Sequence, residues 1–82
     1  MSDIALKLTK IGHALANDFT EKPSPQALGI LLVNNLDFFT ELSPAIVYLN
    51  EAGLNDQTLY HLSRSAVINA FYRAAEFAAN PL

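Results

Sequence analysis

The sequence contains no cysteine, so disulfide bonds cannot stabilise this small domain. It also lacks a long apolar run: the longest, ALGILLV at residues 27–33, falls far short of the roughly 20 residues that cross a bilayer. The opening stretch, MSDIALKLTK, has no basic start followed by an apolar segment, as a targeting signal would. We therefore expect a cytoplasmic protein without a membrane-spanning helix.

The chain has few charged residues, and its net charge is slightly negative. Eight acids and five bases give a net charge of −3, which argues against broad binding to nucleic-acid phosphates. The hydrophobic fraction of 51% is too high for a disordered chain. With 82 residues, the chain has room for a single domain, residues 1–82, with a modest core.

Clusters of chemically reactive residues are absent as well. His13 and His61 fall on different predicted elements, and neither belongs to a spaced set of metal ligands. Ser24 and Ser43 are explained as helix caps before proline, and the three glycines are too isolated to form a phosphate-binding loop. We expect no enzymatic activity, no cofactor and no metal.

Prolines and capping residues divide the chain into helices. Pro25 and Pro44 each follow a serine that can cap a helix, and proline is favoured at the first helical position. Gly53 is typical of a C-terminal helix stop with the next residue folding back. We expect the first helix to begin at Ser2 or Asp3, and the fourth to be capped by Asn55 or Asp56. The predicted helices span about 3–20, 25–40, 44–52 and 56–79.

Apolar residues at three- and four-residue steps predict one buried stripe on the first helix and one on the fourth. Short connections between such helices favour antiparallel neighbours, so we predict an all-α, antiparallel up-and-down four-helix bundle. Repeated alanines in the fourth helix would allow a close approach to a neighbour. The two stripes are Ile4, Leu8, Ile11, Leu15 and Phe19, and Leu59, Leu62, Ala66, Ala70, Ala74 and Phe77.

The second predicted helix is apolar nearly all round. Leu28, Leu32, Leu36 and Phe39 form its main stripe, but other large apolar residues cover the remaining surface. Such a helix lies at the centre of a core or meets a partner. The first alternative makes helix 25–40 the central core helix, and the second makes it a protein interface, including that of a homodimer.

An outward strip on the fourth helix is the candidate partner-binding surface. At about 100° per residue, Arg64, Ile68 and Tyr72 fall opposite the inward stripe. Tyrosine and arginine are favoured in protein interfaces because they combine large contact area with a polar tip. The candidate partner-binding residues are Arg64, Ile68, Asn69, Tyr72, Arg73 and Phe77.

A purely structural alternative exists for the same strip. Ile68 and Tyr72 would then pack beneath another helix or the C-terminal tail. The two arginines would pair with carboxylates, for which Glu41, Glu51 and Glu76 are the candidates.

Two segments carry a resemblance to a known family. RSAVINAFYRA, residues 64–74, resembles the C-terminal helix motif of pediocin-like (class IIa) bacteriocin immunity proteins of the enterocin A type. PSPQALGILLVNNL, residues 23–36, is similar to that family's second helix, with Leu32, Val33 and Asn34 at the centre of the match. The two motifs occur in the family's order and at similar spacing.

The resemblance implies an antiparallel four-helix bundle in the cytoplasm, at the inner face of the membrane. Such proteins protect a cell by engaging the membrane receptor of the mannose phosphotransferase system once a bacteriocin has bound it. Specificity in the family lies largely in the C-terminal half, which here means the fourth helix and the tail EFAANPL at residues 76–82. The rival interpretation is a small helical adaptor or dimerisation module with an unrelated protein partner.

Overall fold

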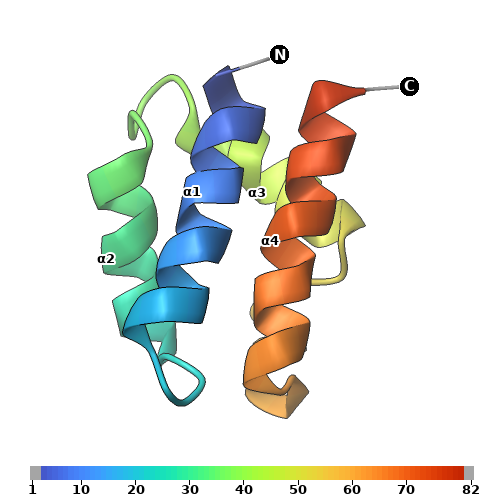
Figure 1. Ribbon diagram of the computed structural model, residues 1–82. Helices are drawn as coiled ribbons and strands as arrows, with labels where there is room; N and C mark the ends of the chain where they lie inside the picture. The colour runs from blue at the N-terminus through green and yellow to red at the C-terminus, as the bar shows by residue number, and fades with distance from the viewer. Residues whose placement is uncertain (1–2, 81–82) are drawn as a thin grey trace.

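The computed structural model describes residues 3–80, and it confirms the all-α bundle. Over this range four α-helices follow one another without a β-strand (Figure 1). α1 runs opposite to both α2 and α4, and α3 crosses the bundle obliquely. Ser2, one expected start of the first helix, and the last two residues of the tail lie outside the described residues. The elements are α1 (Asp3–Asp18), α2 (Pro25–Asn35), α3 (Leu42–Glu51), the 3₁₀ turn η1 (Leu59–His61) and α4 (Arg64–Ala79).

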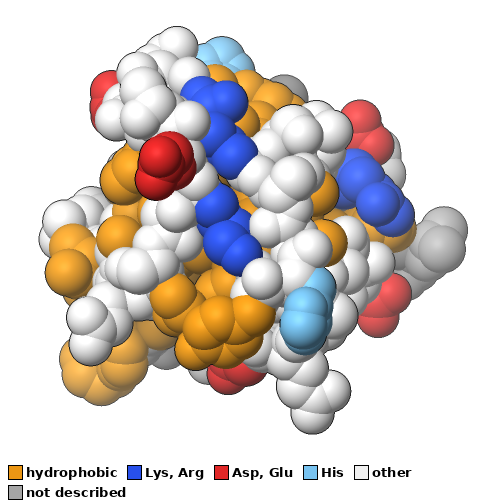
Figure 2. All heavy atoms as spheres, turned by 90° about the horizontal axis from the view of Figure 1, so that it is seen from below, with side chains coloured by type: hydrophobic (Ala, Val, Ile, Leu, Met, Phe, Trp, Pro, Cys, Tyr) orange, Lys and Arg blue, Asp and Glu red, His pale blue; other side chains and the backbone are white. Residues whose placement is uncertain are grey.

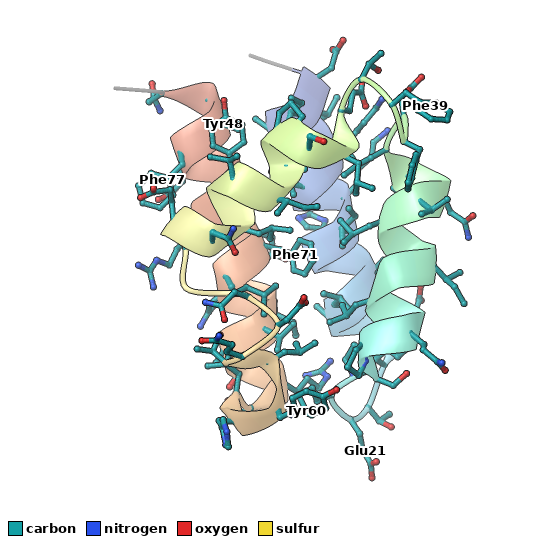
Figure 3. The ribbon with its side chains drawn as sticks, turned by 180° about the vertical axis from the view of Figure 1, so that it is seen from behind. Glu21, Phe39, Tyr48, Tyr60, Phe71 and Phe77 are labelled. Atoms are coloured by element: carbon teal, nitrogen blue, oxygen red, sulfur yellow. The ribbon has the colours of Figure 1, made fainter. Side chains whose placement is uncertain are left out.

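The core is built around the contact between α1 and α4, which lie side by side along most of their lengths (Figure 1). The predicted stripe of α1 is confirmed: Leu8, Ile11 and Leu15 are fully buried, and its two end residues pack partly buried against the core. α3 covers another side of α4. Phe71 of α4 lies at the centre of the bundle with no exposed surface (Figure 3).

α2 is a peripheral helix, so the prediction that it is the central core helix is wrong. Its close backbone approaches are mainly to α1 and are sparse, and Leu28 is its one buried residue among those described. Ile30 is 63% exposed and Val33 is 49% exposed. The all-round apolar character of this helix therefore reflects an uncovered surface.

The second helix is shorter than predicted because Asp37 starts a turn. The carboxylate of Asp37 accepts the backbone N–H groups of Phe39 and Thr40, each at 3.0 Å, and Leu36 is already extended. This local side-chain bond competes with helix continuation. Phe39, which the periodicity assigned to the buried stripe, is instead 89% exposed at the edge of the molecule (Figure 3).

The fourth helix begins at Arg64, eight positions later than expected from residue 56. Asn55 does accept capping bonds, from Gln57 and Thr58, but it closes a turn that leads into η1. The true cap of α4 is Ser63, whose hydroxyl accepts the N–H of Ala66. The three-residue spacing of apolar residues through η1 resembles that of a helix, and the sequence therefore predicted a helix start that is too early.

The remaining helix ends lie within two residues of the positions predicted from the sequence. Ser24 caps α2 with Pro25 at its first position, as predicted. Gly53 has a φ of +89° and ends α3, and Leu54 folds back to donate its N–H to Leu49 O at 2.9 Å. The expected cap Ser43 instead lies inside α3, which begins at Leu42.

Phe71→Ala should destabilise the protein by about 3–5 kcal/mol, because it removes a large side chain from a fully enclosed site. Phe39→Ala is the matched control and should change stability by about 0.5 kcal/mol or less, since that ring lies in solvent. Chemical denaturation of both variants measures the difference. Equal losses would contradict the placement of the two rings.

Acid should weaken the α2–α3 turn. Bonds from Thr40 and Phe39 hold the pKa of Asp37 below its ordinary value of 3.8. The unfolded chain therefore takes up this proton at a higher pH than the folded chain. The stabilisation is complete above pH 3.8 and is lost as the pH falls through the lower folded pKa.

Thermal melting from about pH 6 to about pH 2 should show a smaller acid-induced fall in Asp37→Asn than in the parent protein. Asparagine keeps an acceptor oxygen for the turn but does not titrate. Identical pH dependence in the two proteins would show that Asp37 contributes nothing to it.

Candidate functional site on the fourth helix

The six candidate partner-binding residues separate into two groups. Asn69, Arg73 and Phe77 are exposed, Phe77 at 37%, and follow one another at four-residue spacing on the outer side of α4. Figure 3 shows Phe77 at the edge of the bundle. The other three residues, Arg64, Ile68 and Tyr72, are buried or half-buried.

Arg64 is a structural link at the base of the bundle. Its guanidinium donates from Nε to Phe19 O at 2.6 Å and from Nη2 to Ala16 O at 2.7 Å. These carbonyls lie at and just beyond the C-terminal turn of α1, where backbone acceptors are unpaired and a positive charge is favourable. The prediction that Arg64 stands on a free outward face is therefore wrong.

Lys22 makes a second link at the same end. Its ammonium donates to Leu59 O at 2.9 Å and to Tyr60 O at 3.0 Å, and so joins the α1–α2 connection to η1. Figure 2 looks onto this end, where Lys and Arg side chains lie among hydrophobic ones. Because Lys22 and Arg64 are engaged with backbone carbonyls, they do not form a free basic patch.

Ile68 and Tyr72 pack against the bundle, as the structural alternative anticipated. Ile68 is 8% exposed and belongs to the core. The ring of Tyr72 lies over Gly12 of α1 so closely that a Cβ on that glycine would come within 2.9 Å of it. The same ring contacts His13 edge-on, with 5.7 Å between centroids. Of the two alternatives left open for these residues, the structural one is correct for Ile68, and Tyr72 is half-buried.

The physical reason is that α4 has two neighbours. α1 packs on one side and α3 on another, so the buried arc is much wider than a single stripe. Apolar residues at adjacent positions, Val67–Ile68 and Ala74–Ala75, are the sequence signal of this wider arc, and all four are buried. An analysis that assigns one buried stripe to the helix does not detect this wider buried arc.

The predicted pairing of the arginines with carboxylates is wrong within residues 3–80, because the ion pair found there joins Lys7 to Glu41. The hydrogen bond that Lys7 donates in this ion pair lowers the pKa of Glu41. Arg73 takes part in no ion pair in this range, so its charge is available on the outer face of α4.

A groove between α2 and α3 was not predicted from the sequence. Two adjoining hollows, of about 590 and 700 Å³, share Gly29, Leu32 and Ile46 and together form what we term the α2–α3 groove. Phe71 lies at the bottom of the first hollow, and Ile30 and Val33 line the second. The additional lining residues are Pro25, Gln26, Leu28, Asn34, Phe38, Leu42, Leu49, Asn50, Leu54, Asn55, Asp56, Gln57 and Leu59.

No group of three or more His, Cys, Asp or Glu side chains is placed to hold a metal ion in the described part of the chain. None of the helices in residues 3–80 combines the length and apolar character needed to cross a membrane. Comparison of the chain with protein-family models, with curated proteins and with solved structures finds no match.

Replacing the two arginines of α4 should reduce stability by very different amounts. Arg64→Ala should cost about 1.5–3 kcal/mol, because charge-assisted bonds to the end of α1 are lost. Arg73→Ala should cost about 0.5 kcal/mol or less. Denaturant unfolding of the two variants measures this contrast. A larger loss in Arg73→Ala would overturn the division of α4 into linking and surface residues.

Proposed function

We propose that this protein protects a bacterial cell from a pediocin-like bacteriocin. It acts without enzymatic chemistry, by engaging the mannose phosphotransferase receptor with its bound bacteriocin from the cytoplasmic side. The observation that carries the proposal is the pair of motifs at residues 23–36 and 64–74, in the order and spacing of the enterocin A type immunity proteins. The antiparallel helical bundle agrees with the fold that this resemblance implies.

The accessible part of the second motif narrows the proposed contact surface. Arg64 and Ile68 are committed to the fold, and Tyr72 packs on Gly12. The exposed residues Asn69 and Arg73, continued one turn further by Phe77, then supply an amide, a positive charge that has no ion pair within residues 3–80, and an aromatic ring. Arginine and aromatic residues in such a row are typical of the energetically dominant parts of protein interfaces.

A protection assay tests the proposal. Cells sensitive to pediocin-like peptides would express the protein and be titrated with a panel of those peptides. We expect raised survival against at least one peptide, and we expect Arg73→Ala and Phe77→Ala each to reduce that survival at least tenfold. Lys10→Ala, which removes an exposed positive charge from α1 instead, should leave protection unchanged.

Unchanged survival across the panel, with the protein folded and abundant, would reject the immunity function. Protection that persists in the Arg73 and Phe77 variants would reject the contact surface alone. Melting temperatures of all variants distinguish a lost contact from a lost fold.

A second candidate function is supported by the uncovered apolar surface of α2. Under this proposal the chain is a small helical adaptor or dimerisation module, and residues 25–40 form the interface, including that of a homodimer. Ile30 and Val33, both about half or more exposed, are the observation in its favour. Sedimentation at several protein concentrations would report a stable dimer if the module pairs with itself.

A further inference from the structure

The positive charges of this chain are confined to one part of it. All five Lys and Arg residues lie at positions 7, 10, 22, 64 and 73, and the stretch between Lys22 and Arg64 contains none. That stretch builds α2, α3 and η1 and carries four carboxylates: Asp37, Glu41, Glu51 and Asp56. The segments that form most of the α2–α3 groove therefore carry a net negative charge, and the bases belong to α1, α4 and the loop before α2. Two of these bases reach the groove segments: Lys7 pairs with Glu41, and Lys22 donates to the carbonyl of Leu59.

The floor of the groove is apolar and uncharged. Its central residues Gly29, Leu32 and Ile46 belong to both hollows, and Asp56 is the one charged side chain among all the lining residues. A Cβ added at Gly29 would meet no atom within 4 Å, and Gly29 does not have a positive φ. Neither backbone geometry nor internal packing requires glycine here, although alanine would stabilise the helix more. The open space over Gly29 would let another backbone approach closely.

Carboxylates occur in or next to the chain segments that line both hollows. Asp56 lines the first hollow, and Glu51 directly follows the lining residue Asn50. Asp37 immediately precedes Phe38, which lines the second hollow. Glu41 is also close to this segment, but Lys7 engages it. Asp37 is anionic at neutral pH, and bonds from the turn amides lower its pKa further.

We propose that the α2–α3 groove binds an amphipathic helix whose apolar face is flanked by lysine or arginine. The apolar floor would take up the hydrophobic stripe of that helix, as in other helix-in-groove complexes. These carboxylates would attract its basic flanks and increase the association rate. The proposal develops the second candidate function, the helical adaptor, and does not rest on the immunity function. The groove is also separate from the exposed row Asn69, Arg73 and Phe77, because α2 and α4 lie on opposite sides of the bundle (Figure 1).

A second copy of this chain fits the groove less well. Pairing α2 with its own symmetry mate would place one set of acidic segments against another, and Lys7, the lysine nearest to them, is already engaged with Glu41. A basic helix meets the same surface with complementary charge. The charge distribution thus selects between two occupants that the apolar floor alone would accept.

Two synthetic helical peptides provide the test. Both would be about 18 residues long, or about 27 Å, with the same leucine stripe. One would carry lysine on its remaining positions and the other glutamate. We expect the lysine peptide to bind at least tenfold more tightly by calorimetry, with affinity falling as salt is added. Amide shifts in the NMR spectrum of the labelled protein should concentrate at α2 and α3.

Matched variants locate the contact. Gly29→Leu fills the open space over α2 and should weaken binding of the lysine peptide at least tenfold, whereas Ala16→Leu on α1 should have no effect. Asp56→Asn should weaken it severalfold, and Glu76→Gln on α4 should not. Melting curves establish that each variant is folded.

Three results would overturn the proposal. One is the absence of measurable binding of the lysine peptide, or equal binding of both peptides. Another is full affinity in a folded Gly29→Leu variant. The third is a stable dimer of the protein alone that Gly29→Leu converts to a monomer, because the groove would then belong to a second copy.

Discussion

The close packing of α1 on α4 is the contact on which the rest of the structure depends. Small residues permit it: Gly12 on α1 accommodates the ring of Tyr72, while Ala70 and Ala74 are buried along α4. Arg64 then fixes the lower end of the pair by donating to the last carbonyls of α1. α3 and the α2 connection are added to this pair, and their positions follow from it.

α4 interleaves residues that hold the fold with residues that face solvent. In α4, Ile68 and Phe71 hold the fold, whereas Asn69 and Arg73, one and two positions away, face solvent. A motif within such a helix mixes structural and surface residues. When such a motif is similar to a motif in another protein, the similarity indicates first that the two helices pack in the same way. A shared binding partner would require that the exposed residues are similar as well.

The parts of the fold that depend on local chemistry were predictable from the sequence. The cap at Ser24, the stop at Gly53 and the buried stripe of α1 were all confirmed. The errors arose where tertiary contacts determine which residues are buried. Few residues of other elements pack on α2, so much of its surface is exposed. Ile68 is buried because α4 has two neighbours. The α2–α3 groove joins residues from five separate segments, so no local pattern could have revealed it.

The pairing of α1 with α4 also governs when the chain can fold. α1 is synthesised early, but its principal partner begins only at Arg64. Until α4 has left the ribosome, the apolar stripe of α1 has no matching surface, and helices of this length are marginal alone in water. We therefore expect the nascent chain to stay largely unstructured and open to chaperones until α4 emerges, and then to fold in one cooperative step.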